Sequence, residues 1–263
     1  MKKIRKHLRF NVDIVSHCNL NCKCCGHFSP LATPDFLDQA EFQRDLERIA
    51  FLTDGIIDRI ELMGGEPLLH PQVNEFISIS RTIFPKAEIN ICTNGILLEK
   101  QTSAFFEICA SNDASIAISH YPIKLQWDKI EEIRKMYKVN IYMVNTHGSD
   151  KRLWYKNRRD LTGSQDIESN FDKCPWGNNC VILEHGKLAT CVMPFKAPYF
   201  NKFYRTNDFK ITSSDYIDIY KAKSITEILT FLATPINCCR YCKPQDDELI
   251  EWGTSTKSIE EWI

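Results

Sequence analysis

The sequence lacks the features that mark membrane, secreted and polyanion-binding proteins. No apolar run reaches the roughly 18 residues of a membrane span. The N-terminal residues 1–9 are basic, but the apolar stretch of a secretory signal peptide does not follow them before the charged Asp13. Lysine and arginine number 33 against 34 acidic residues, so the net charge of −1 provides no basic field for nucleic acid or anionic lipid. Repeats and low-complexity tracts are also missing. We therefore expect a soluble cytoplasmic protein with neither nucleic acid nor membrane among its partners.

Cysteine, by contrast, is abundant. The chain has 12 cysteines in 263 residues, of which 43% are hydrophobic, enough for a substantial core. Because the cytosol keeps thiols reduced and disulfides there are rare, metal ligation is the leading interpretation. Cys92 and Cys109 lie in apolar stretches, and we interpret these two as small buried hydrophobic side chains.

Strand-like and helix-like segments alternate over the first half of the chain. Alternating or short apolar runs predict strands, and apolar residues with helical spacing predict helices. The predicted strands are 9–16, 59–63, 88–92, 114–119 and 139–144. The predicted helices are 41–52, 73–83, 99–110 and 128–137. This order favours an α/β fold, a partial (β/α) TIM-like barrel of five or six parallel strands joined by crossover helices.

Short polar motifs follow the predicted strands. They are HCNLNC, GGEP, TNG, SH and NTH. In barrels and open sheets of this kind, functional groups gather at the carboxyl ends of the strands. We therefore expect the site at that edge of the sheet.

The alternation stops after about Gly148, and we place a domain boundary near residue 170. Domain 1–170 is the barrel, and domain 171–263 is a small α+β unit. Within the second domain we predict a hairpin over 181–193 that turns at Gly186, an aromatic segment over 195–204 and a helix over 224–232.

Three cysteines share the loop after the first predicted strand. Cys18, Cys22 and Cys25 offer thiolates, which suit iron–sulfur clusters and zinc alike. A structural zinc site normally closes with four ligands, usually as two separated pairs, so three ligands in one loop favour a cluster with one open iron. Cys24 is a rival to Cys25, but only Cys25 gives the x3, x2 spacing.

This triplet, together with Gly64-Gly65-Glu66-Pro67 at the end of the next strand, resembles the radical S-adenosylmethionine superfamily. The resemblance implies that Cys18, Cys22 and Cys25 hold a [4Fe-4S] cluster whose fourth iron is chelated by S-adenosyl-L-methionine. It also implies a 5′-deoxyadenosyl radical that removes hydrogen from a substrate, and a reducing electron-transfer protein such as flavodoxin or ferredoxin.

The resemblance also implies contacts to the S-adenosylmethionine. Gly64, Gly65 and Glu66 would meet the methionine amino group, a cationic end that needs acceptors. Ser119, at the end of a predicted strand, matches the place of a polar contact to the ribose or the methionine carboxylate. Asn94, in the TNG turn, would also face the ligand.

One position departs from the family pattern. The residue before the third cysteine is usually aromatic and packs near the adenine, and here it is Cys24. Phe28 is close enough in sequence to take its place.

The C-terminal cysteines resemble the auxiliary-cluster appendages called SPASM and Twitch domains. The resemblance implies a second [4Fe-4S] cluster with four ligands, Cys174, Cys191, Cys239 and Cys242. Gly186, between the first two cysteines, is the glycine of this motif. Four ligands fit the shorter Twitch version and leave Cys180 and Cys238 spare. Cys238 replaces Cys239 only if the last pair has an x3 spacing, and zinc held by the same four cysteines is the alternative.

A fully ligated second cluster would serve electron transfer, which favours net oxidation. By analogy with small enzymes of this layout, we expect an oxidoreductase that oxidises an alcohol on a carbohydrate or cyclitol-like small molecule. Radical epimerisation and peptide modification stay open, as does a non-catalytic zinc or redox-sensing protein. His120 and His147 are acid–base candidates. The basic stretch 151–159 either binds an anionic group or forms a solvated face.

Overall fold

The computed structural model describes residues 1–144 and 153–263. None of the helices in these ranges has the length and apolarity that a transmembrane segment requires. His147, Lys151 and Arg152, which the sequence suggested as functional candidates, lie outside the described residues.

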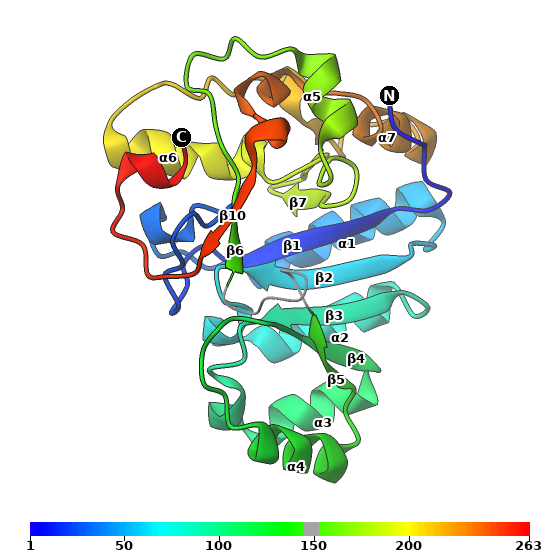
Figure 1. Ribbon diagram of the computed structural model, residues 1–263. Helices are drawn as coiled ribbons and strands as arrows, with labels where there is room; N and C mark the ends of the chain where they lie inside the picture. The colour runs from blue at the N-terminus through cyan, green and yellow to red at the C-terminus, as the bar shows by residue number, and fades with distance from the viewer. Residues whose placement is uncertain (145–152) are drawn as a thin grey trace.

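One eight-stranded sheet organises the protein (Figure 1), in the order β5-β4-β3-β2-β1-β7-β8-β9. The strands are β1 (Arg9–Val15), β2 (Arg59–Gly64), β3 (Glu88–Thr93), β4 (Ala114–Ser119), β5 (Ile141–Val144), β7 (Ile182–Glu184), β8 (Lys187–Ala189) and β9 (Ile217–Asp218). Strands β1 to β5 pair in parallel, and β7 joins β1 in parallel as well. Strands β8 and β9 add antiparallel pairs. The predicted partial barrel of five or six parallel strands is confirmed.

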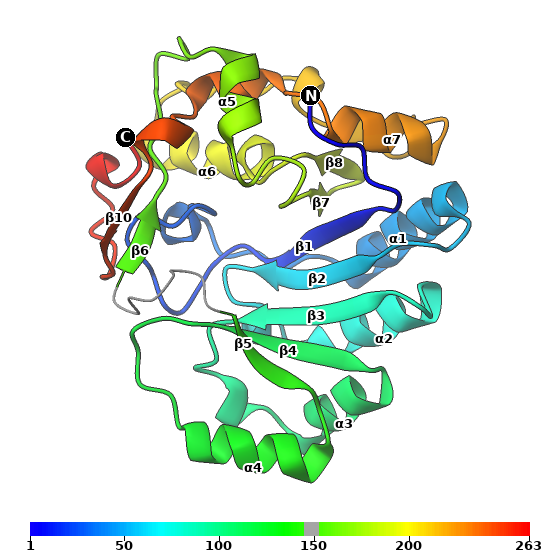
Figure 2. The same cartoon turned by 45° about the vertical axis from the view of Figure 1, so that its right-hand side comes forward.

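Four helices connect the parallel strands and build the main core with them (Figure 2). They are α1 (Gln39–Thr53), α2 (Val73–Ile83), α3 (Ser103–Ser111) and α4 (Trp127–Tyr137). Apolar residues of β1 such as Phe10 and Val12 pack in one core with Leu46 of α1 and Ile77 of α2. The intervening residues of β1, Asn11 and Asp13, are polar. Because side chains alternate between the two faces of a strand, these two residues lie on the face opposite the core. The sheet therefore keeps a polar face on the side away from this core.

The rest of the chain adds three helices and a two-stranded ribbon. The helices are α5 (Ile167–Lys173), α6 (Met193–Tyr204) and α7 (Ile225–Leu232). The ribbon pairs β6 (Leu153–Lys156) with β10 (Glu248–Glu251) in antiparallel fashion, as Figures 1 and 2 show. The 3-10 helices are Ser29–Leu31, Pro67–Leu69, Leu98–Lys100, Ser213–Asp215, Asn237–Tyr241, Pro244–Asp246 and Ile259–Glu261. The predicted helix over 99–110 is thus a 3-10 turn followed by α3, and the aromatic segment is the helix α6.

A second hydrophobic core joins the cysteine loop after β1 to the C-terminal part of the chain. It combines Phe28 and Leu31 with Phe171, Phe200 and Trp262. The sheet likewise continues from β1 to β7 across the predicted boundary near residue 170. The division into two domains therefore stays a prediction, while the contacts show that both parts surround the same loop.

Candidate functional site

A cavity of about 320 Å³ lies where the parallel strands end, and cysteines from both ends of the chain line it. These cysteines are Cys18, Cys22, Cys24, Cys25, Cys92, Cys174, Cys180, Cys191 and Cys242. Cys92 was interpreted as a buried hydrophobic side chain, and this interpretation is wrong because the residue faces the cavity. Cys109 is buried in the main core, as expected.

The three cysteines of the N-terminal loop lie close together. The pKa of the Cys18 thiol rises to about 11, first through burial and also through the charges of Glu66 and Cys25. Burial also raises the pKa values of Cys22 and Cys25. Thiols with raised pKa values become thiolates only beside a strong positive partner, and an iron–sulfur cluster is one. The donor set therefore fits the cluster that the sequence implied.

A backbone amide and an indole donate hydrogen bonds to two sulfurs of this loop. The backbone N–H of Leu20 donates to Cys18 Sγ at 3.4 Å. The indole N–H of Trp252 donates to Cys22 Sγ at 3.3 Å. Such donors stabilise negative charge on a sulfur, so the loop is built to carry thiolates.

Cys24 stands where the family usually has an aromatic residue, and Phe28 was expected to replace that residue. Cys24 lines the cavity beside Cys25, so the preference for Cys25 as ligand stays a prediction. Phe28 is fully buried in the second core and stacks on Trp262, with 5.7 Å between the ring centroids. Phe28 does not line the cavity and therefore does not take the place of the missing aromatic residue.

Gly64 and Gly65 hold the end of β2 against the cysteine loop. A Cβ on Gly65 would lie 2.0 Å from the carbonyl oxygen of His17, and one on Gly64 would lie 2.2 Å from that of Val15. Gly64 also has a φ of +133°, which a residue with a side chain rarely adopts. Both glycines line the cavity, and their contact with a ligand stays a prediction.

Glu66 is fully buried and does not line the cavity. Its carboxylate accepts hydrogen bonds from the backbone N–H of Leu68 at 3.0 Å, the hydroxyl of Thr93 at 2.6 Å and the backbone N–H of Asn94 at 2.9 Å. Burial raises its pKa to about 7. In this structure Glu66 orders the turn after β3, and its predicted contact with the methionine amino group stays a prediction.

Asn94 and Ser119 both line the cavity, at the ends of β3 and β4. The side-chain amide of Asn94 donates to Asn19 Oδ1 at 2.8 Å and to Cys18 Sγ at 3.7 Å. Asn94 therefore contacts the cysteine loop, and Ser119 lines the same cavity, while their contact with a ligand stays a prediction. His120 is not among the cavity-lining residues.

The C-terminal cysteines form a second group, of which Cys174, Cys191 and Cys242 line the cavity. Burial and the charges of Cys191, Cys242 and Cys174 raise the pKa of Cys239, so the four predicted ligands interact electrostatically. Cys239 itself does not line the cavity. A hydrogen bond from Cys238 lowers the pKa of Cys191. The choice between Cys238 and Cys239 therefore stays a prediction.

The side chain of Asn170 on α5 fixes the last cysteine turn. Its amide donates to the carbonyl oxygen of Cys239 at 2.9 Å and also to that of Cys242. The contact joins the helix before Cys174 to the turn that carries the last pair.

Apart from Arg159, which belongs to the basic stretch 151–159, one wall of the cavity was missed by the sequence analysis. It consists of Tyr121, Trp154, Tyr155, Asn157, Arg159, Trp176 and Asp247. Asn157 donates to Asp247 at 2.9 Å, and the rings of Tyr121 and Trp154 lie 5.0 Å apart. Arg159 of the basic stretch faces the cavity, whereas Arg158 pairs with Glu248 at 2.8 Å on the surface. No local pattern could reveal this wall, because its residues come from segments near positions 121, 154–159, 176 and 247 that are far apart in the chain.

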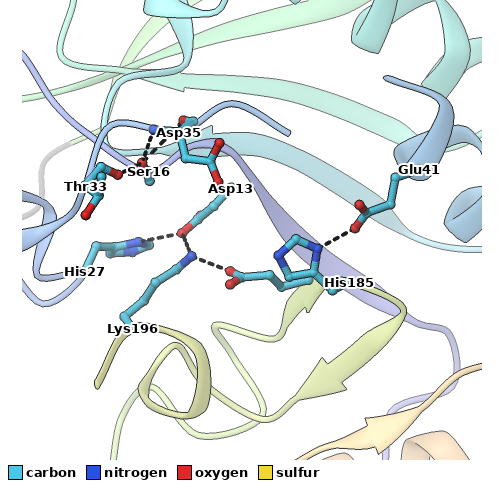
Figure 3. Close-up of polar contacts among 9 residues, drawn as sticks. Asp13, Ser16, His27, Thr33, Asp35, Glu41, His185 and Lys196 are labelled. Carbon is cyan, nitrogen blue, oxygen red and sulfur yellow. Dashed lines mark hydrogen bonds and ion pairs between the residues drawn. The ribbon is translucent and has the colours of Figure 1, made fainter. Parts of the chain in front are cut away.

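A buried ion network lies behind the cysteine loop (Figure 3). Lys196 Nζ lies 2.9 Å from Asp13 Oδ2 and also contacts Glu184, and His27 Nδ1 lies 3.1 Å from the same oxygen of Asp13. Burial alone would raise the pKa of Asp13, but the charges of Lys196 and His27 hold it well below its usual range. The network ties β1, β7, α6 and the cysteine loop together.

The cysteine thiols of the site line a cavity and, within the described part of the chain, are not arranged as the ligands of a single metal ion. Among residues 1–144 and 153–263, no three His, Cys, Asp or Glu side chains are placed to hold a single metal ion. Cysteines of the N-terminal loop and cysteines of the C-terminal group both line the cavity.

Comparisons with known proteins agree with this geometry. The family model described as the radical SAM superfamily matches residues 12–172, more than half of the chain. A GTP 3′,8-cyclase of Chlorobaculum tepidum is 33% identical over 96 residues, which cover 36% of this chain and 28% of that protein. A GTP 3′,8-cyclase of Helicobacter pylori is 32% identical over 89 residues, or 34% of this chain and 28% of that protein. The chain thus matches less than a third of the length of these curated relatives.

Among solved structures, BtrN in complex with AdoMet and 2-DOIA is similar in fold. It aligns with a TM-score of 0.54 at 17% identity, over 92% of this chain and 94% of that chain. The similarity therefore extends through the C-terminal part, beyond the residues that the family model matches.

Proposed function

Because the chain belongs to the radical SAM superfamily, we propose that Cys18, Cys22 and Cys25 hold a [4Fe-4S] cluster and that S-adenosylmethionine binds beside it in the cavity. When bound, these cofactors supply a 5′-deoxyadenosyl radical that takes a hydrogen atom from the substrate. The observation that carries the proposal is that the cysteine loop, Gly64 and Gly65 line the same cavity.

The residues around the loop prepare it for this task. Gly64 and Gly65 allow the end of β2 to approach the cysteine loop within backbone contact. Asn94 points an amide donor at Cys18 Sγ, and Ser119 offers a hydroxyl to a polar ligand group at the next strand end. These contacts support the proposed roles of Asn94 and Ser119 in ligand binding.

We further propose that Cys174, Cys191, Cys239 and Cys242 hold a second [4Fe-4S] cluster in a Twitch-type domain that begins near residue 171. Their mutual proximity supports this assignment. The family model ends at residue 172, just before the first of them, which supports the proposed boundary.

For the substrate, we propose a small polar molecule of the carbohydrate or cyclitol class that is oxidised at an alcohol carbon, with the second cluster as electron acceptor. Arg159, Asn157 and Asp247 place donors and acceptors on one wall of the cavity, which suits hydroxyl-bearing substrates. The aromatic residues of the same wall exclude water from the site.

A reaction on a nucleotide is the second candidate function. It is favoured by the curated relatives, which are named GTP 3′,8-cyclases. The mass of the product distinguishes the two, because alcohol oxidation removes two hydrogens whereas cyclisation or epimerisation leaves the mass unchanged.

The enzyme also needs a reductant. We propose a low-potential electron-transfer protein such as flavodoxin or ferredoxin in the cytoplasm. Dithionite replaces it in the assay below.

Anaerobic reconstitution tests the cofactor assignment. We expect about eight irons per chain, since each of the two clusters contains four, and formation of 5′-deoxyadenosine after addition of dithionite and S-adenosylmethionine. The triple variant Cys18→Ala, Cys22→Ala, Cys25→Ala should lose about four irons and all cleavage. The quadruple variant of the C-terminal ligands should lose about four irons but keep cleavage.

Cys109→Ala serves as the control, because Cys109 is buried in the main core and does not line the cavity. It should retain iron and cleavage. Normal cleavage by the triple variant would overturn the assignment of the first cluster.

A further inference from the structure

The segment after β10 forms a strand-like pair with the cysteine loop. Residues 21–23 and 253–255 lie antiparallel around a bridge between Cys22 and Thr254. On each side of the bridge a backbone hydrogen bond of 2.8 Å joins the two segments. In Figure 1 the red C-terminal segment lies beside the blue loop. The C-terminal end of the described chain therefore covers the middle cysteine of the triplet.

Trp252, the first residue of this segment, reaches the sulfur itself. Its indole N–H donates to Cys22 Sγ at 3.3 Å, and its side chain is half-buried. Cys22 lines the cavity but Trp252 does not, so the indole meets the sulfur from the protein side. A ligand in the cavity would leave this contact in place.

Trp262 holds the same loop in a different way. Its indole N–H donates to the backbone carbonyl oxygen of Cys25 at 2.9 Å, and its ring stacks on Phe28. Two tryptophans of the C-terminal segment thus anchor the cysteine loop, but only Trp252 donates to a sulfur.

We propose that Trp252 is a positioning residue that raises the reduction potential of the cluster bound by Cys22, through its N–H···S hydrogen bond. The inference rests on the proposed function, in which Cys22 is a cluster ligand. Reduction adds one negative charge, part of which the sulfur ligands carry, so a donor to sulfur stabilises the reduced state more than the oxidised one. Removal of the donor shifts the potential to a more negative value and makes the cluster harder to reduce.

The test compares Trp252→Phe with Trp262→Phe. Both replace an indole that anchors the loop with a smaller ring without an N–H, but only the first removes a donor to sulfur. Wild type and both variants are reconstituted anaerobically and their iron is counted. The midpoint potential is then measured by a redox titration that follows the EPR signal that changes on addition of S-adenosylmethionine.

We expect Trp252→Phe to keep its iron and to show a more negative midpoint, while Trp262→Phe keeps the wild-type midpoint. An unchanged midpoint in Trp252→Phe, or an equal shift in both variants, would overturn the proposal. If Trp252→Phe loses the cluster, benzothienylalanine at position 252 replaces only the N–H by sulfur and keeps the ring shape. The same midpoint criterion then applies.

A failure of the proposed function has a different signature. In that case Cys22→Ala would retain the iron and the EPR signal that responds to S-adenosylmethionine. The result would place the cluster on other ligands, whatever the midpoint of the Trp252 variants.

Discussion

Glu66 should make the stability of this protein fall as the pH rises. Its side chain is fully buried, and burial raises its pKa from the usual 4.5 to about 7, although three hydrogen bonds oppose the change. The folded protein therefore holds this proton more tightly than the unfolded chain does. The resulting stabilisation is fully present below about pH 4.5 and is lost as the pH rises through about 7.

The size of the effect follows from the two pKa values. The difference corresponds to about 3 kcal/mol between the fully protonated and fully ionised limits. Over the accessible interval from about pH 5.5 to about pH 8, it amounts to about 2 kcal/mol. For a chain of this size, that change lowers the thermal midpoint by about 4–8 °C.

Glu66→Gln removes the titrating group but keeps the shape. The glutamine amide also places an NH2 group opposite one of the three hydrogen-bond donors, so we expect a lower thermal midpoint than in wild type at about pH 5.5. Because the titrating group is gone, the thermal midpoint should also depend less on pH. Thermal unfolding followed by circular dichroism from about pH 5.5 to about pH 8 measures the slope. Glu107→Gln, at an exposed position of α3, should keep the wild-type slope. A Glu66→Gln variant with the wild-type slope would refute the reasoning.

Two further substitutions test the packing around the cysteine loop. Gly65→Ala places a Cβ 2.0 Å from a backbone oxygen, so it should lower the free energy of unfolding, measured by thermal unfolding, by about 3 kcal/mol. Gly253→Ala has open space around its Cβ and should keep the wild-type thermal midpoint. Equal midpoints for the two would contradict the close approach. Lys196→Met removes the cation that contacts the carboxylates of Asp13 and Glu184 and leaves Asp13 with His27 alone, so it should cost about 3–5 kcal/mol in urea denaturation. Arg158→Ala, at an exposed pair, should cost at most about 1 kcal/mol. Addition of Glu184→Gln to Lys196→Met should recover part of the loss, and no recovery would argue against the ion network.

The parallel strands were predictable because each one carries its own local pattern. The predicted strand 114–119 coincides with β4, and the predicted helix 73–83 coincides with α2. The hairpin turning at Gly186 is also present as β7 and β8. In each case one face of the element is buried, so apolar residues recur with the period of a strand or a helix, and this repeat is visible within a few residues.

The segments that were missed lack such a repeat. The helix α6 contains Pro194 and Pro198 and is rich in aromatic residues on more than one face. The strand β6, LWYK, belongs to a two-stranded ribbon with no periodic core face, and its partner β10 lies far along the chain. Tertiary pairing rather than local preference makes these segments regular.

By itself, the sequence determined the chemistry of the site: three thiols in one loop after a strand, and two glycines where the next strand ends. These features are local, because ligand spacing and backbone conformation act over a few residues. Only the tertiary structure decided that Glu66 is buried, that Cys174, Cys191 and Cys242 line the same cavity as the cysteine loop and that Trp252 donates to Cys22. Such contacts join residues far apart in the chain, and their existence depends on how strands and loops pair across the whole fold.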